Sequence, residues 1–168
     1  EYGVALAPWL HYLLRFATSF VAAYGFAMLF NSPHRVCFAA AMIGAVINTA
    51  RIGLALQLHV PVPAAVGLAA LAAGLLAGFV ARKTRFSRVT LSVPAVVIMI
   101  PGVPLYRALT YLNNAQIDDA IAALVTVMFT IVAIGMGLAL SRMLTDKNWL
   151  VEKQERVPNL WEYEEENA

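Results

Sequence analysis

The sequence predicts an all-α, polytopic membrane protein with five transmembrane helices. Hydrophobic residues make up 61% of the 168 and the mean hydropathy is +0.71, well above the roughly half-apolar composition of a soluble domain. No aspartate or glutamate occurs between Tyr2 and Ile117. Crossing about 30 Å of hydrocarbon takes roughly 20 helical residues, and five apolar stretches are long enough: residues 9–30, 36–58, 62–81, 89–112 and 120–141.

The basic residues predict how these spans are oriented. The chain has 12 lysines and arginines, and three of them, Arg15, Arg51 and Arg107, lie inside spans. The other nine (12 minus three) all fall within residues 31–35, within residues 82–88 or after residue 141. With five spans these regions share one face of the membrane, and the opposite face has no lysine or arginine. The positive-inside rule then places the N-terminus outside and the C-terminus in the cytoplasm.

Two regions follow from this topology: a five-span transmembrane domain over residues 1–142 and a polar cytoplasmic tail over residues 143–168. The tail ends in an acidic cluster around Glu164, which is either a solvated end or a docking surface for a basic partner. The basic residues lie at span ends, where anionic lipid headgroups are the expected neighbours. The net charge of +2 therefore does not indicate nucleic-acid binding.

The fourth span is expected to be broken at Pro101-Gly102. Proline removes a backbone N–H and clashes with the carbonyl one turn earlier, and Pro104 follows closely. Unpaired backbone groups within a membrane are tolerated only inside protein or beside a wet cavity. Transporters use such half-helices to aim an N-terminus at an anionic group. The second half-helix is expected to begin near Pro104, which suits a first turn; a kink without a ligand is the alternative.

Arg51 is the strongest candidate for a binding residue. A charge at the bilayer centre costs about 3 kcal/mol or more, and no span contains a carboxylate that would neutralise it. Its counter-ion is therefore water, a backbone carbonyl, a carboxylate of another chain or a bound anion. Asn48 precedes it on the same helical face, so amide and guanidinium together can hold a carboxylate. Alternatively, the Arg51 side chain extends outward to the membrane surface or hydrogen-bonds to a neighbouring backbone. Arg15 and Arg107 are nearer span ends and are expected to snorkel.

Small residues at four-residue spacing predict a packing seam between helices. Such residues let helix backbones approach closely in lipid, where no hydrophobic force drives helices together. The third span carries Ala70, Gly74 and Gly78, and the fifth carries Ala133, Gly137 and Ser141. Both sets are interpreted as packing surfaces rather than ligand sites.

Three segments carry a recognisable pattern: residues 24–35 (YGFAMLFNSPHR), 48–51 (NTAR) and 94–106 (PAVVIMIPGVPLY). Together they resemble the threonine/serine exporter (ThrE) family, more narrowly its small five-span YjjB-type subunit, over about residues 22–142. The family serine-rich or histidine-bearing segment before the second-span arginine is Asn48-Thr49-Ala50 here, a departure that bears on the substrate. The matching positions are Gly25, Phe26, Asn31, Pro33, Arg35, Arg51, Pro94, Pro101, Gly102 and Tyr106.

The resemblance implies a subunit of a secondary transporter in the bacterial plasma (inner) membrane. Family members export L-threonine and L-serine, and the small-subunit type is also associated with succinate export. The implied partner is a larger membrane subunit with a cytoplasmic hydrophilic region and five further spans; further copies of this chain are the other possibility. The two halves would then be inverted-topology repeats.

We expect a small carboxylate substrate to pass between the second span and the broken fourth span. Arg51 would hold the carboxylate, with backbone N–H groups after Gly102 assisting. A non-conducting scaffold or assembly subunit and a homo-oligomeric channel are the alternatives. An enzyme is not expected, because the spans lack paired carboxylates, zinc-spaced histidines and a Ser/His set; no cofactor or metal is predicted. The predicted substrate-binding residues are Arg51, Asn48, Gly102, Pro101, Tyr106 and Asn31.

Overall fold

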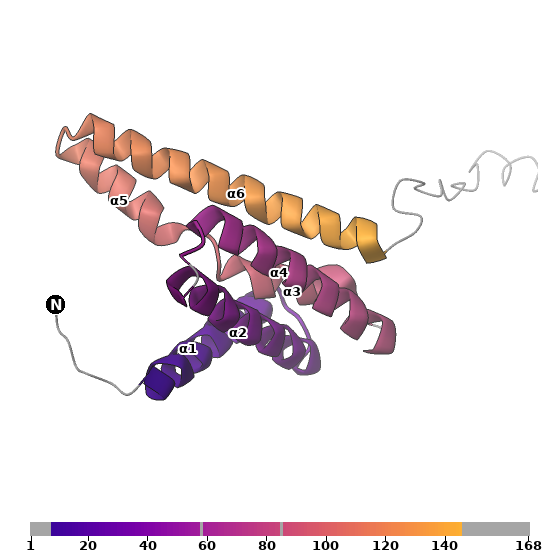
Figure 1. Ribbon diagram of the computed structural model, residues 1–168. Helices are drawn as coiled ribbons and strands as arrows, with labels where there is room; N and C mark the ends of the chain where they lie inside the picture. Colours follow the sequence, from indigo (N-terminus) through magenta and orange to yellow (C-terminus); the bar gives the residue numbers. More distant parts are fainter. Residues whose placement is uncertain (1–7, 58, 85, 146–168) are drawn as a thin grey trace, which may run out of the picture.

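The computed structural model describes residues 8–57, 59–84 and 86–145, and these form six α-helices (Figure 1). Four of the helices are each long and apolar enough to span a membrane, and α4 and α5 form a bent pair that brings the number to five if the pair is one broken span. The predicted all-α, multi-span fold is therefore confirmed. The predicted tail lies outside the described residues from residue 146 onward. The helices are α1 (Pro8–Leu29), α2 (His34–Gln57), α3 (Val62–Thr84), α4 (Arg88–Val97), α5 (Gly102–Asn113) and α6 (Ile117–Thr145).

The fourth span is unwound over residues 98–101, where the sequence predicts a break, and its two halves are bent by 44°. Pro101 has φ −76° and ψ 59°, the geometry of an inverse γ-turn. The Gly102 N–H closes this turn by donating to the Ile100 carbonyl at 2.8 Å. Pro104 lies in the first turn of α5, where its missing N–H removes no intrahelical bond. The second half of the span, α5, is thus separated from α4 by a turn and not by a simple kink.

The core is built around α2, which packs against α1, α3 and α4 (Figure 1). The contact with α4 is close: a Cβ added to Gly44 would lie 3.2 Å from the Cα of Ala95. In contrast, α5 packs against α6. The substrate path expected between the second and fourth spans is therefore closed along α4, because small residues on both helices allow their backbones to meet there.

Glycines hold α3 and α6 together, as the small-residue spacing predicts. A Cβ on Gly74 would lie 2.1 Å from the Ser141 Oγ, and a Cβ on Gly137 would lie 2.4 Å from the Gly67 carbonyl oxygen. These distances leave no room for a side chain at either position. The predicted packing seam is confirmed, and it fixes the long helix α6 across α3 (Figure 1).

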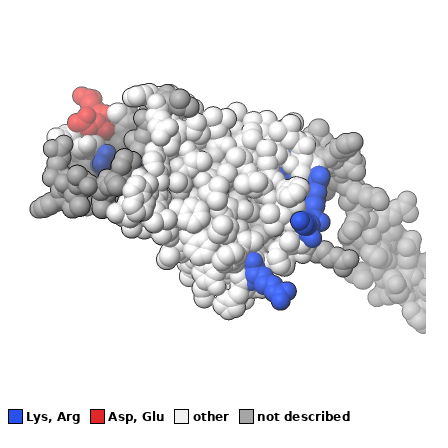
Figure 2. Space-filling model, turned by 60° about the horizontal axis from the view of Figure 1, so that its bottom comes forward, with Lys and Arg blue, Asp and Glu red and all other residues white. Residues whose placement is uncertain are grey.

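Charged side chains separate toward the two ends of the helices. Figure 2 shows the acidic groups at one end and most of the lysine and arginine side chains toward the other. Asp118 and Asp119, the acidic residues of the described part of the chain, lie in the first turn of α6, where the helix dipole favours negative charge. The described basic residues at helix ends are Arg35, Arg82, Lys83, Arg88 and Arg142. This separation agrees with the predicted basic face; which end faces the cytoplasm stays a prediction.

Candidate functional site

Polar side chains line the contact between α1 and α2. Ser19 and Asn48 are only 7% and 8% exposed, and Asn48 Nδ2 donates to Ser19 Oγ at 2.8 Å. The other end of the same amide, Asn48 Oδ1, accepts from Arg51 Nε at 3.0 Å. Asn48 therefore links a buried hydroxyl of α1 to the guanidinium of α2. The pairing of Asn48 with Arg51 that their spacing predicts is present in the structure.

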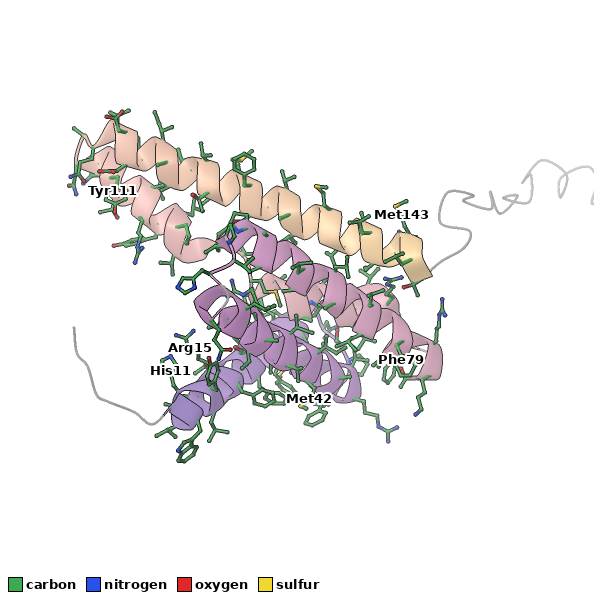
Figure 3. All side chains as sticks on the ribbon, viewed as in Figure 1. His11, Arg15, Met42, Phe79, Tyr111 and Met143 are labelled. Atoms are coloured by element: carbon green, nitrogen blue, oxygen red, sulfur yellow. The ribbon has the colours of Figure 1, made fainter. Side chains whose placement is uncertain are left out.

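Arg15 brings a second guanidinium group to this contact. His11, Arg15 and Ser19 share one face of α1 because they recur every four residues. Arg15 Nε donates to His11 Nε2 at 2.8 Å, and Figure 3 shows both side chains on neighbouring turns of α1. Because arginine is always charged, this bond requires His11 to be unprotonated at Nε2. Arg15 is also close enough to Arg51 for their positive charges to interact. We call these two residues the arginine pair.

One further hydrogen bond joins α1 and α2 at the far end of their polar contact. Gln57 Nε2, in the last turn of α2, donates to the Tyr12 hydroxyl at 3.2 Å. Tyr12 also lies against α2 one turn earlier, because a Cβ on Gly53 would be 4.0 Å from its ring. The polar contact therefore runs along the N-terminal half of α1 and the C-terminal half of α2, from Ser19 to Gln57.

The arginine pair is not neutralised within the described part of the chain. The carboxylates there, Asp118 and Asp119, belong to α6, which packs against α3 and α5. Among the described residues no backbone carbonyl accepts from Arg51, and its two terminal nitrogens have no hydrogen-bond partner. The alternative that Arg51 braces a neighbouring backbone therefore does not hold for the described residues. A half-buried guanidinium with open terminal nitrogens can bind an anion through two parallel bonds.

The other predicted site residues lie apart from the arginine pair. Pro101 is buried, while Gly102 is exposed and Tyr106 is 71% exposed on α5, the helix that packs against α6. Asn31 lies in the turn after α1 with φ 54°, a left-handed conformation that asparagine tolerates. It precedes α2, so the part of this helix from His34 to Arg51, about 25 Å at 1.5 Å per residue, separates it from Arg51. Binding roles for these four residues stay predictions.

Sequence reasoning missed the contribution of α1. Arg15 was expected to snorkel from its span end, whereas the structure places it near enough to Arg51 for their charges to interact, with His11 bonded to it. The signal was the four-residue spacing that puts both on one face with Ser19; the sequence could not say which helix that face meets. Arg107, by contrast, is exposed on α5 and has no hydrogen-bond partner among the described residues.

Replacing Asn48 with alanine is expected to lower the free energy of unfolding by about 1–3 kcal/mol, because the buried Ser19 hydroxyl and Arg51 Nε each lose a partner. Thermal unfolding of the purified protein in detergent measures this. The control is Asn113→Ala, which removes the same amide from an exposed position and is expected to change stability by less than about 0.5 kcal/mol. Equal unfolding temperatures for the two variants would contradict the bridging role of Asn48.

The helices define a multi-pass membrane protein, and the arginine pair lies at the contact between its first two helices. A protein-family model described as "Threonine/Serine exporter, ThrE" matches residues 15–144, most of the chain. The chain therefore belongs to the threonine/serine exporter (ThrE) family, a family of membrane transporters. No curated protein and no solved structure matches the sequence.

Proposed function

We propose that this chain is a subunit of a secondary transporter that exports small carboxylate-bearing metabolites across the bacterial inner membrane, with the arginine pair binding the carboxylate. One observation carries the proposal: Arg15 and Arg51 lie close enough for their positive charges to interact across the contact of α1 and α2, and no described carboxylate neutralises them. Family membership makes L-threonine and L-serine the first candidates. A dicarboxylate such as succinate suits the pair as well, because each guanidinium can engage one carboxylate.

A second five-span unit would complete the site. The arginine pair is only half-buried, and charged groups in a membrane need protein or water around them. The outer surface of α1 is largely apolar and exposed, with Trp9, Leu13 and Val21 among its exposed side chains. The proposed partner is the larger subunit of the family or a further copy of this chain. With the N-terminus outside and the C-terminus in the cytoplasm, a larger subunit of opposite orientation would form an inverted repeat with it.

The broken span supplies a second, movable element in this proposal. The Val103 N–H at the start of α5 has no acceptor among the described residues, and Gly102 leaves the backbone beside it uncovered. The N-terminus of a half-helix attracts negative charge. In this structure α5 packs away from the arginine pair. The substrate would therefore contact the arginine pair and the N-terminus of α5 in different states of the transport cycle.

Changing Gly102 to alanine is expected to leave the unfolding temperature unchanged, because a Cβ at this position meets nothing within 4 Å and its φ lies outside the left-handed region. Export is expected to fall severalfold, because the new methyl group covers the backbone that the substrate approaches. Thermal unfolding and export rate are measured on the same preparation. Export at the wild-type rate would remove Gly102 from the binding residues.

The direct test is transport by the native assembly. The full chain is purified from native membranes with whatever co-purifies, the partner is identified, and the assembly is reconstituted into vesicles. Outward flux of labelled L-threonine, L-serine and succinate is then measured for the wild type and for Arg51→Gln. Flux that requires the partner and falls in the variant supports the proposal. Equal flux in both would assign the path to the partner and leave this chain a scaffold.

A further inference from the structure

A second site lies at the basic end of the helices, away from the arginine pair. It is a cavity of about 280 Å³ beside the α3 and α6 seam, with α4 forming another wall. Arg88 and Ser92 line it from α4, and Ser141 and Arg142 line it from α6. Among the described residues, no carboxylate lines this cavity. We call it the basic pocket.

Arg88 is held in a fixed position on one wall of the basic pocket. One of its terminal nitrogens donates to the Gly74 carbonyl at 3.0 Å and to Ser141 Oγ at 3.0 Å. Ser141 Oγ in turn donates to the Leu138 carbonyl at 2.7 Å. The guanidinium is thus anchored to α3 and α6 at once, which presents its positive charge to the cavity without further ordering.

Ser92 points to a ligand in the basic pocket. Its side chain is 8% exposed, so it is more than nine-tenths buried, and it lines the cavity. Among the described residues its hydroxyl makes no hydrogen bond. Its oxygen is not among the fully enclosed atoms that lack a partner, so it is open to the cavity that the residue lines. A ligand oxygen within the cavity can therefore bond to it.

The residues that line the basic pocket suit a ligand with an anionic group and an apolar part. Two guanidinium groups and a hydroxyl form the polar side, the donor set that suits a phosphate group. Leu138 and Val89 form apolar walls, and Val89 is 61% exposed toward the surroundings. Arg88 begins α4 and Arg142 lies in the last turn of α6, so the pocket opens where span ends are expected to meet lipid headgroups. We infer that the basic pocket binds the phosphate of an anionic phospholipid, with the acyl chains running along these apolar side chains.

The test compares lipid binding to the purified full chain in neutral detergent by native mass spectrometry and thermal unfolding. The probes are phosphatidylglycerol, phosphatidylcholine with the same acyl chains, and free glycerol 3-phosphate. Phosphatidylglycerol is expected to bind several-fold more tightly than phosphatidylcholine. Arg142→Gln is expected to weaken phosphatidylglycerol binding about tenfold, since it removes one charge-assisted contact.

Two further variants separate a lipid site from a folding defect. Ser92→Ala is expected to weaken phosphatidylglycerol binding a few-fold, yet not to lower the lipid-free unfolding temperature, because the lost hydroxyl has no described partner. Arg107→Gln removes the same charge from an exposed position of α5 and is expected to bind like the wild type. Unchanged binding in Arg142→Gln and Ser92→Ala would overturn the inference. Free glycerol 3-phosphate that stabilises as strongly as the lipid would overturn the lipid assignment in favour of a soluble anion.

Discussion

Changing Arg51 to glutamine is expected to reduce outward flux of L-threonine about 10- to 100-fold. A charge-assisted bidentate pair with a carboxylate contributes about 1.5–3 kcal/mol, and each 1.4 kcal/mol is about tenfold in affinity. The flux of Arg51→Lys is expected to lie between those of the wild type and Arg51→Gln. Lysine keeps the charge but loses the planar fork of the guanidinium and the bond from Nε to Asn48. Efflux from cells loaded with a threonine dipeptide, at matched amounts of inserted protein, measures the effect.

The control for this experiment is Arg107→Gln. It removes the same positive charge from an exposed position on α5 with no described hydrogen-bond partner, so flux is expected to stay within about twofold of the wild type. Wild-type flux in Arg51→Gln would remove Arg51 from the mechanism. Equal losses in both variants would point to membrane insertion or overall charge instead of a binding site.

Changing Gly137 to alanine is expected to lower the free energy of unfolding by forcing α3 and α6 apart. The new Cβ would lie 2.4 Å from the Gly67 carbonyl oxygen and 2.9 Å from the Leu71 backbone nitrogen. Both neighbours are backbone atoms of α3 and cannot rotate away, so the two helices must separate. Overpacking of this kind costs about 1–3 kcal/mol, which corresponds to an unfolding temperature lower by several degrees. Thermal unfolding followed by size-exclusion chromatography in detergent measures it.

Gly135 provides a matched control on the same helix. It is exposed, and a Cβ there meets nothing within 4 Å. Gly135→Ala is therefore expected to be neutral or to stabilise by up to about 1 kcal/mol, since alanine is the better helix former. If Gly137→Ala unfolds at the same temperature as Gly135→Ala, the close contact between α3 and α6 is not needed for stability.

Features that depend on the local chain were predicted well from the sequence. Spans are readable because every backbone group in lipid must be satisfied within its own helix, so each crossing needs one long apolar stretch. The break at Pro101 and Gly102 was predicted because proline removes a hydrogen bond from whichever helix contains it. The seam of Gly74 and Gly137 was predicted because small residues matter mainly where backbones meet.

The candidate site was predicted only in part. Asn48 and Arg51 share a helix face, so three-residue spacing alone brings them together. The bond to Ser19 and the nearness of Arg15 cross between helices, and they depend on how α1 is rotated against α2. The route expected between α2 and the fourth span was closed for the same reason, because Gly44 lets α4 approach.

The sequence alone thus determined that the chain crosses a membrane several times, where its fourth span breaks, and that the arginines within its spans have no acidic partner there. Only the tertiary structure decided that two of those arginines come close enough for their charges to interact and that α5 lies away from them. The physical reason is that hydropathy and helix geometry act within one segment. Helix rotation in lipid is set instead by the close fit of small side chains on two separate segments.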